Sequence, residues 1–352
     1  MLNKVVLEDL EFIRQSPIDW NRFKNKTVLI TGAYGMLASY IVKILMYLND
    51  MDPTYNIKII GVVRNLEKAS AKLAEYLGNG NFQLLVKDVC SSVELDCKVD
   101  FIIHAASLAS SQYYGVNPVG TLMPNVIGTY HLLELARKHK IEGFLFLSSG
   151  EVYGEVSSNI ITEMDYGYLD PVALRSCYGE SKRMGEAMCR AWQCQYKVPA
   201  KIVRIAHTYG PTMELENDSR VFSEFVADVV NNRNIIMKSD GTAYRPFCYI
   251  SDATVAFFKV LLEGKPGEAY NVCNDKGIIS IGELAKLLVE MFPEKGLKVV
   301  LQKRTEDNTY LESSQPKPVV LDISKLKSLG WEPIYSIESG FKRTIESFNK
   351  VR

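Results

Sequence analysis

The stretch "VLITGAYGMLASY", residues 28–40, decides the fold, because it joins strand-forming residues to two glycines and then to a helical pattern. Gly32, directly after the strand, permits a tight turn, and Gly35 lets the backbone approach a pyrophosphate at the N-terminus of the next helix. Ala38 stands where a third glycine would allow close packing of helix and strand, and its single methyl group is tolerable there. The two glycines alone are equally consistent with an ordinary turn between a strand and a helix, so the pattern around them decides.

Strands and helices alternate over the first 206 residues. The predicted strands are residues 27–31, 57–63, 82–89, 99–106, 143–149 and 200–206. The predicted helices lie at about 36–48, within 66–77, at about 119–140 and at 178–196. Continuous apolar strands separated by helices indicate a parallel sheet that is covered on both faces. The predicted fold class is therefore α/β, a Rossmann-like doubly wound parallel sheet with a smaller C-terminal substrate-binding lobe.

The chain divides into three parts. Residues 1–24 form an N-terminal helix and linker, for which packing onto the main body is the simplest role. Residues 25–206 form the predicted NAD(P)-binding Rossmann domain, to which a segment near 246–273 returns one more strand. Residues 207–245 and 274–352 form the smaller lobe, where the elements are shorter and a proline-bearing loop, "SSQPKPVV", interrupts them.

The composition excludes several classes of partner. Lys plus Arg and Asp plus Glu both number 41, so no net charge draws the protein to nucleic acid or to an anionic membrane. No uncharged apolar run approaches the roughly 18 residues of a membrane helix, and the acids in "MLNKVVLEDLEFIRQ" argue against a signal peptide. The seven cysteines are scattered without a C-x-x-C pair or a Cys/His cluster, which predicts thiols, a cytoplasmic protein and no metal site.

The end of the second predicted strand bears on the choice of cofactor. An acid at this place would hold the ribose hydroxyl of NAD(H), whereas the sequence "GVVRN" puts Arg64 there. A cation suits the additional phosphate of NADP(H), which is therefore favoured, with NAD(H) as the alternative. A solvated arginine in a loop is the competing interpretation. Asp88, after the third strand, is expected either to bind the adenine amine or to cap a helix.

Tyr178 and Lys182 form the pattern Y-x-x-x-K on a predicted helix, where residues four apart share a face. A neighbouring ammonium lowers the pKa of a phenol, which makes Tyr178 a candidate general acid and base for interconverting an alcohol and a ketone. Ser149, at the end of the fifth predicted strand, is expected to bind the same oxygen. The pattern is common by chance, and it gains weight only from its place in a glycine-loop fold.

From about residue 26 to the C-terminus the sequence resembles the extended short-chain dehydrogenases/reductases that modify nucleotide sugars. The resemblance is carried by the segments "TGAYGMLAS", "HAAS", "NPVGTLMPNVIGT", "SSGEVYG", "RSCYGESKR", "VRIAHTYGP", "RPFCYISDA" and "LGWEP". The nearest subgroup is the UDP-glucuronate decarboxylases, with the 4,6-dehydratases and 4-ketoreductases of dTDP-sugars as relatives. A nucleotide-diphosphate sugar as substrate and a homodimer built from the helices near 119–140 and 178–196 are implied.

The resemblance also assigns roles by position. The implied catalytic residues are Ser149, Glu151, Tyr178 and Lys182. With Arg64 and Asp88 included, the implied cofactor-binding residues are Gly32, Ala33, Gly35, Met36, Leu37, Arg64, Asp88, Val89, Ala105, Ala106, Tyr178 and Lys182. The implied substrate-binding residues are Ser107, Arg175, His207, Arg220 and Arg245. Arginines suit a diphosphate, because guanidinium groups form charge-assisted hydrogen bonds with phosphate oxygens.

Gly150 departs from the family pattern, because dehydratases have Asp and decarboxylases have Ser at this position. Glycine has no side chain to donate a proton, which disfavours 4,6-dehydration and weakens the decarboxylase assignment. Together with Arg64, this favours an NADPH-dependent reductase of a dTDP- or UDP-linked 4-keto-6-deoxy sugar. The alternatives are a UDP-glucuronate decarboxylase or a related dehydratase or epimerase. A non-catalytic NADP-sensing protein is disfavoured, because Tyr178 and Lys182 are both present.

Overall fold

A seven-stranded parallel sheet forms the centre of the molecule, in a computed structural model that describes residues 3–216, 218, 220–302 and 318–348. The strand order is β11-β7-β5-β4-β1-β2-β3. The strands are β1 (Thr27–Thr31), β2 (Lys58–Val63), β3 (Phe82–Val86), β4 (Phe101–His104), β5 (Gly143–Ser149), β7 (Ala200–Ile205) and β11 (Ala269–Val272). All neighbouring pairs run parallel, which confirms the predicted fold class and the returning strand.

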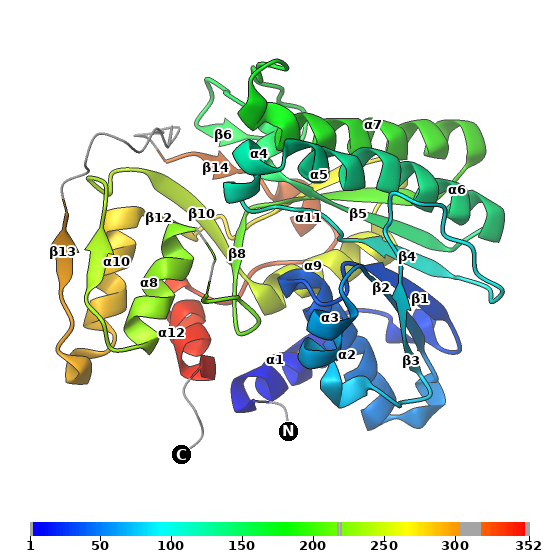
Figure 1. The fold of residues 1–352 in the computed structure, drawn as a ribbon, viewed down its shortest axis with the longest axis horizontal. Helices are drawn as coiled ribbons and strands as arrows, with labels where there is room; N and C mark the ends of the chain where they lie inside the picture. The colour runs from blue at the N-terminus through cyan, green and yellow to red at the C-terminus, as the bar shows by residue number, and fades with distance from the viewer. Residues whose placement is uncertain (1–2, 217, 219, 303–317, 349–352) are drawn as a thin grey trace.

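Helices cover both faces of this sheet, as Figure 1 shows. One face carries α4 (Gln112–Val116), α5 (Pro118–Met123), α6 (Thr129–His139) and α7 (Cys177–Tyr196). The other carries α1 (Lys4–Gln15), α2 (Met36–Met51), α3 (Leu66–Lys72) and α9 (Ile250–Glu263). The apolar side chains form two separate buried clusters, one on each side of the sheet, as expected for a doubly wound fold.

The prediction of a single helix over residues 119–140 is wrong in one respect. A π-helical turn, Pro124–Gly128, separates α5 from α6. Pro124 has no backbone N–H and cannot continue the normal helical hydrogen bonding, so the turn widens here. Gly128 lies in the same turn, and a Cβ atom on it would come within 2.8 Å of Val89 Cγ2, so the helix approaches the loop after β3 closely.

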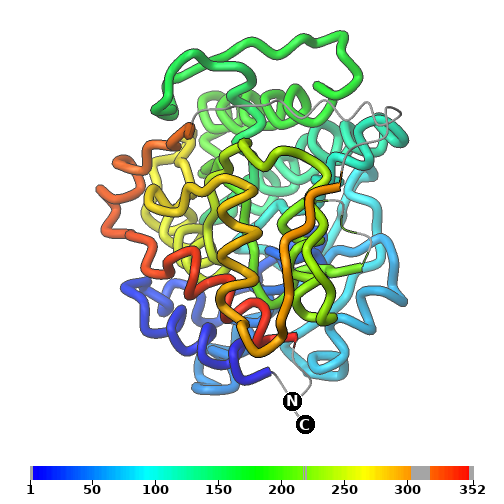
Figure 2. Tube along the Cα trace, turned by 90° about the vertical axis from the view of Figure 1, so that its left-hand side faces the viewer, coloured from blue at the N-terminus to red at the C-terminus, as the bar shows by residue number. Residues whose placement is uncertain are grey.

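The helix α1 packs against the main body through Val6, Leu10 and Ile13, which are buried. The side chain of Asn3 caps this helix by accepting a hydrogen bond from the Val5 N–H. The same side chain donates to the Ser347 carbonyl at the end of α12 (Ile337–Phe348), at 2.9 Å. The start of α1 and the end of α12 therefore lie side by side, as both views show (Figures 1 and 2).

The smaller lobe lies beside the sheet in Figure 1 and is built from short elements. Its strands are β8 (His207–Tyr209), β10 (Tyr244–Tyr249) and β12 (Ile278–Ser280) in one sheet, and β9 (Ile235–Met237) with β13 (Val299–Leu301) in another. Its helices are α8 (Val221–Val230), α10 (Ile281–Glu290) and α12. A further pair, β6 (Ile160–Ile161) with β14 (Val320–Leu321), and α11 (Ser324–Lys327) complete the described strands and α-helices. Residues 313–317 of the predicted proline-bearing loop lie outside the described residues.

Candidate active site

The turn between β1 and α2 has the geometry that the two glycines predict. Gly32 has a φ of 64°, and a Cβ atom placed on it would lie 3.0 Å from the Cα atom of Ala106. The Gly35 N–H donates to the Gly32 carbonyl at 2.7 Å, and Gly35 is the N-cap residue of α2. Ala33 and Ala38 are buried, so the methyl group at the third glycine position is accommodated. The turn thus fits a dinucleotide phosphate at a helix N-terminus.

A buried histidine, which the sequence analysis did not single out, fixes the loop opposite this turn. His104 Nδ1 lies 2.8 Å from Thr31 Oγ1, and His104 Nε2 lies 3.2 Å from the Pro124 carbonyl oxygen. The same hydroxyl oxygen accepts the backbone N–H groups of Ala105 and Ala106 at 3.1 and 3.0 Å. Because a carbonyl can only accept, Nε2 carries the proton and Nδ1 accepts from Thr31. Burial lowers the pKa of His104 to about 3, so the ring is neutral.

Arg64 and Asp88 lie at neighbouring strand ends, as predicted. Both side chains are about half exposed, and Arg64 Nη1 lies 4.0 Å from Asp88 Oδ2. The other oxygen of Asp88 accepts the Cys90 N–H at 2.8 Å within a turn. No helix lies among the described residues between β3 and β4, so the helix cap considered for Asp88 is not formed. Of the other predicted cofactor residues, Met36 and Leu37 begin α2, whereas Val89 is buried against the π turn.

The predicted catalytic residues come together where β5 ends and α7 begins. The Ser149 hydroxyl lowers the pKa of the Tyr178 phenol, so the two side chains are neighbours, and the Glu151 N–H donates to Ser149 Oγ at 3.2 Å. Lys182 Nζ donates to the Leu147 carbonyl at 2.6 Å and lies 5.7 Å from the centroid of the Tyr178 ring. Tyr178 and Lys182 are buried, and Glu151 is exposed.

The electrostatics of this cluster differ from the sequence-based expectation. Burial raises the pKa of Tyr178, and the Ser149 hydroxyl opposes that shift only in part. Burial also lowers the pKa of Lys182 to about 7, although the charge of Glu186 favours the ammonium. The predicted lowering of the Tyr178 pKa by a neighbouring ammonium is therefore wrong for this structure, because desolvation outweighs charge at both groups.

Beneath the cluster lies a buried ion pair that the sequence analysis also missed. Glu186, one turn beyond Lys182 on α7, accepts hydrogen bonds from Arg204 Nη2 at 2.7 Å and from Ser148 Oγ at 2.6 Å. Both charged side chains are almost fully buried. The pair joins α7 to β5 and β7 at the level of Lys182.

Three of the predicted substrate-binding residues gather in the smaller lobe. The ring of His207 lies against Phe222 and Phe247, and its pKa is lowered to about 3 by burial, with the charges of Arg245 and Arg220 as the next causes. Arg220 binds Asp218, with Nη2 2.6 Å from Oδ2. These residues thus bring two cationic side chains to one place beside a neutral histidine.

The other two predicted substrate-binding residues lie nearer to the catalytic cluster. Ser107 follows the loop after β4, and its buried hydroxyl has no hydrogen-bond partner in the described part of the chain. Arg175 is exposed in the short turn before α7, and its charge acts on the nearby phenol of Tyr114.

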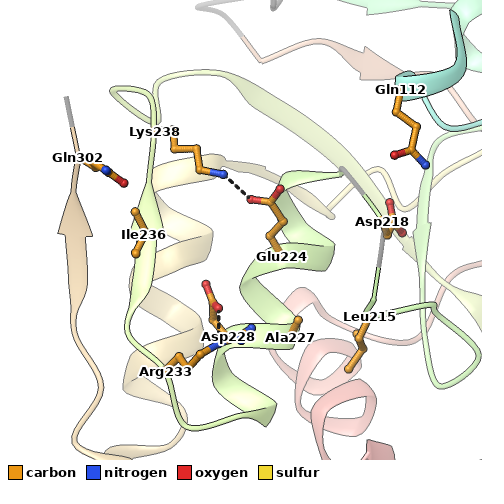
Figure 3. A pocket seen from close by; sticks show the side chains of 10 residues that line it. All are labelled: Gln112, Leu215, Asp218, Glu224, Ala227, Asp228, Arg233, Ile236, Lys238 and Gln302. Carbon is orange, nitrogen blue, oxygen red and sulfur yellow. Dashed lines mark hydrogen bonds and ion pairs between the residues drawn. The ribbon is translucent and has the colours of Figure 1, made fainter. Parts of the chain in front are cut away.

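A hollow of about 450 Å³ lies between α4 and the smaller lobe, as Figure 3 shows. Two ion pairs line it, Lys238 with Glu224 at 3.4 Å and Arg233 with Asp228 at 3.0 Å. The full lining comprises Gln112, Leu215, Asp218, Glu224, Ala227, Asp228, Arg233, Ile236, Lys238 and Gln302. The hollow adjoins the Arg220 region, because Asp218 belongs to its wall and also binds Arg220. None of these lining residues was predicted, since no spacing in the sequence marks them.

Two kinds of feature are absent from the described ranges. No helix there is long and apolar enough to cross a membrane. Nor do the same residues contain a group of three or more His, Cys, Asp or Glu side chains that could hold a metal ion.

Comparison with known proteins gives a consistent result. The chain is 33% identical over 337 residues to UDP-glucuronic acid decarboxylase 6 of Arabidopsis thaliana, which covers 95% of this chain and 92% of that protein. It is also 33% identical over 327 residues to UDP-glucuronic acid decarboxylase 1 of Xenopus tropicalis, covering 92% of this chain and 72% of that protein. These relatives correspond to the decarboxylase alternative of the sequence analysis, and the reductase preference finds no support among them.

Solved structures share the fold. UDP-glucose 4-epimerase of Thermotoga maritima matches with a TM-score of 0.76 and 23% identity, over 92% of this chain and 99% of that chain. UDP-glucuronic acid 4-epimerase of Bacillus cereus, in complex with NAD, matches with a TM-score of 0.74 and 22% identity over 92% and 99%. The profile described as "NAD dependent epimerase/dehydratase family" matches residues 28–273. The chain therefore belongs to this family of extended short-chain dehydrogenases/reductases and is an enzyme that modifies nucleotide sugars.

Proposed function

We propose that the protein is a UDP-glucuronate decarboxylase. The observation that carries the proposal is the cluster of Ser149, Tyr178 and Lys182 next to the glycine turn, in a chain that is 33% identical to such decarboxylases over 95% of its length. Alcohol–ketone chemistry at C4 of the sugar is the step for which a tyrosine, a serine and a lysine in this arrangement are suited.

The residues present fit an NAD(H) site, since the Gly32 turn has no room for a side chain and α2 begins directly after it. A bound NAD(H) would supply reversible oxidation at C4 of the sugar. NAD(H) rather than NADP(H) is proposed, in line with the family and with Arg64 being directed to Asp88. Thr31 holds the Ala105–Ala106 backbone that faces the glycine turn and so fixes the width of the site.

Tyr178 and Ser149 have separate roles in the proposed reaction. In its ionised form Tyr178 would take the proton of the C4 hydroxyl as that carbon is oxidised, while Ser149 would hold the same oxygen. The resulting C4 ketone makes the C6 carboxylate a β-keto acid, which loses carbon dioxide, and C5 takes up a proton. Tyr178 then returns its proton when C4 is reduced again. No oxidant or reductant is consumed overall.

The smaller lobe would bind the nucleotide. Arg220 and Arg245 offer charge-assisted hydrogen bonds to the diphosphate, and the hollow of Figure 3 offers the adjoining volume for the nucleoside. Gly150 leaves the reaction without a side-chain hydroxyl at that position.

The test incubates the purified protein with UDP-glucuronate and NAD, with Tyr178→Phe as the matched variant. We expect release of carbon dioxide and formation of a UDP-pentose by mass spectrometry, without accumulation of NADH. Tyr178→Phe keeps the ring but lacks the proton-transferring oxygen, and should lose about a hundredfold or more in turnover. Consumption of NADPH with dTDP-4-keto-6-deoxyglucose, and no carbon dioxide from UDP-glucuronate, would establish the reductase instead.

We further propose a homodimer built on α5, α6 and α7. These helices expose large apolar side chains, namely Val119, Leu122, Tyr130, Met184 and Tyr196. Exposed apolar surface of this kind marks an interaction site. Light scattering should give the mass of two chains for the wild type and of one chain for Leu122→Glu/Met184→Glu. A monomeric wild type would contradict the proposal.

A further inference from the structure

Tyr114 of α4 lies against the ring of Tyr178. The two ring centroids are 5.1 Å apart and the ring planes differ by 14°, which is a stacked arrangement. Both side chains are only 6% exposed, so the contact is dry. Aromatic pairs in this geometry are favoured beyond the area they bury.

Tyr114 is itself held in place from two sides. Its hydroxyl donates to the Ala109 carbonyl at 3.0 Å, within the loop that follows β4. Its own carbonyl oxygen lies 3.9 Å from Sγ of Cys177, the first residue of α7. Tyr114 thus contacts the loop after β4 through its hydroxyl, and it contacts the helix that carries Tyr178 through its backbone carbonyl.

We propose that Tyr114 is a positioning residue, whose ring fixes the plane of the Tyr178 ring so that the phenol oxygen stays at Ser149. The ring of Tyr178 can otherwise turn about its side-chain bonds. The role of Tyr114 in turnover rests on the proposed function, whereas the ring contact does not.

Burial raises the pKa of both tyrosines, and the charge of Glu151 raises both further. Ser149 and Arg220 oppose the shift at Tyr178, and Arg175 opposes it at Tyr114. The two stacked phenols therefore share one buried environment.

The first experiment compares Tyr114→Leu with Tyr114→Phe in turnover of UDP-glucuronate. Tyr114→Leu should lower kcat by about ten- to a hundredfold, because small misplacements of a reacting group are costly, with little change in KM. Water admitted by the lost ring should also lower the pKa seen in the pH profile of kcat. Tyr114→Phe keeps the ring and should restore both values.

The control is Tyr76→Leu, which removes a buried tyrosine packed on Phe82, before the edge strand β3. It should lower stability while leaving the pH profile unchanged. A Tyr114→Leu protein with a wild-type kcat and pH profile would overturn the proposal. So would a Tyr114→Phe protein as impaired as Tyr114→Leu, because the hydroxyl rather than the ring would then matter.

A second measurement needs no substrate. The free energy of unfolding is measured for Tyr114→Leu, Tyr178→Leu and the double variant. If the rings support each other, the double variant loses less stability than the sum of the two single variants. Additive losses would refute the ring contact itself. The wild type could turn over no UDP-glucuronate while the stability losses of the two single variants are non-additive. That result would contradict the proposed substrate and still support the contact between the two rings.

Discussion

Lys182 lies buried with its Nζ atom 2.6 Å from the Leu147 carbonyl oxygen, and burial lowers its pKa to about 7. An unfolded lysine has a pKa of about 10.4. Between these two values the unfolded chain binds more protons than the folded one, so the free energy of unfolding rises with pH from about 7 to about 10. Below pH 7 both states carry the charge, and the cost of burying it is felt in full.

We predict that Lys182→Met reduces the rise of the melting temperature with pH over this range. Lys201 is the matched control, because burial lowers its pKa to about 8 and its Nζ donates to the Leu261 carbonyl at 2.8 Å. Lys201→Met should reduce the same rise yet keep turnover, whereas Lys182→Met should lose turnover as well. The Lys182→Met variant could instead show the same pH dependence of stability as the wild type. That result would show that Lys182 stays charged in the folded protein over this pH range.

The sequence predicted which side chains meet where local spacing decides the matter. Tyr178 and Lys182 share a helix face, and Ser149 ends the strand beside them, so their meeting follows from the fold. Tyr114 could not be found in this way, because no periodicity connects it to a ring on another helix. The neutral His104 was equally hidden, since its role depends on a hydroxyl on β1 and a carbonyl in a π turn.

At the scale of elements, the β1–α2 turn depends on one backbone conformation. Gly32→Ala should cost about 1–3 kcal/mol for the positive φ, and its methyl group would also displace the backbone of Ala106. Gly78 has a φ of 82°, and a Cβ atom added to it would meet nothing within 4 Å, so Gly78→Ala bears the conformational cost alone.

Calorimetric titration with NAD separates the two effects. Gly32→Ala should bind NAD far more weakly than the wild type, while Gly78→Ala should bind it normally at a similarly reduced melting temperature. Equal NAD affinity in both variants would mean that the β1–α2 turn does not hold the cofactor.

The long parallel elements could be predicted, and the short ones could not. The limits of β1 follow from an apolar run that ends at a glycine. The break at Pro124 was missed because the apolar pattern continues through it, although a proline within a helical pattern itself indicates a helix end or a kink. The strands of the smaller lobe, such as β8 and β9, have only three residues each, too few for a pattern.

At the scale of the whole molecule, a buried acid joins α1 to distant parts of the chain. Asp9 is fully buried and accepts hydrogen bonds from the hydroxyls of Tyr40 and Tyr249 and from Arg343. Burial raises the pKa of Asp9 despite these partners. The network connects the helix before the first strand with α2, with the end of β10 and with α12.

Arg343→Met would leave this carboxylate without its cation and should lower the free energy of unfolding by about 3–5 kcal/mol. Glu8→Gln is the control, because Glu8 binds the same arginine at 2.9 Å but is half exposed, and it should cost about 1 kcal/mol or less. Urea denaturation measures both. Similar losses of unfolding free energy in the two variants would mean that the buried Asp9–Arg343 pair stabilises the fold no more than the half-exposed Glu8–Arg343 pair.

The hydrogen bond between Asn3 and Ser347 has a practical consequence. A short peptide could connect Asn3 to Ser347, and the chain could be opened at Gly78 or Gly80, where an added Cβ atom would meet nothing within 4 Å. Such a circular permutant should retain the parallel sheet. For the same reason, domains inserted before Asn3 and after Ser347 would start next to each other and compete for the same space.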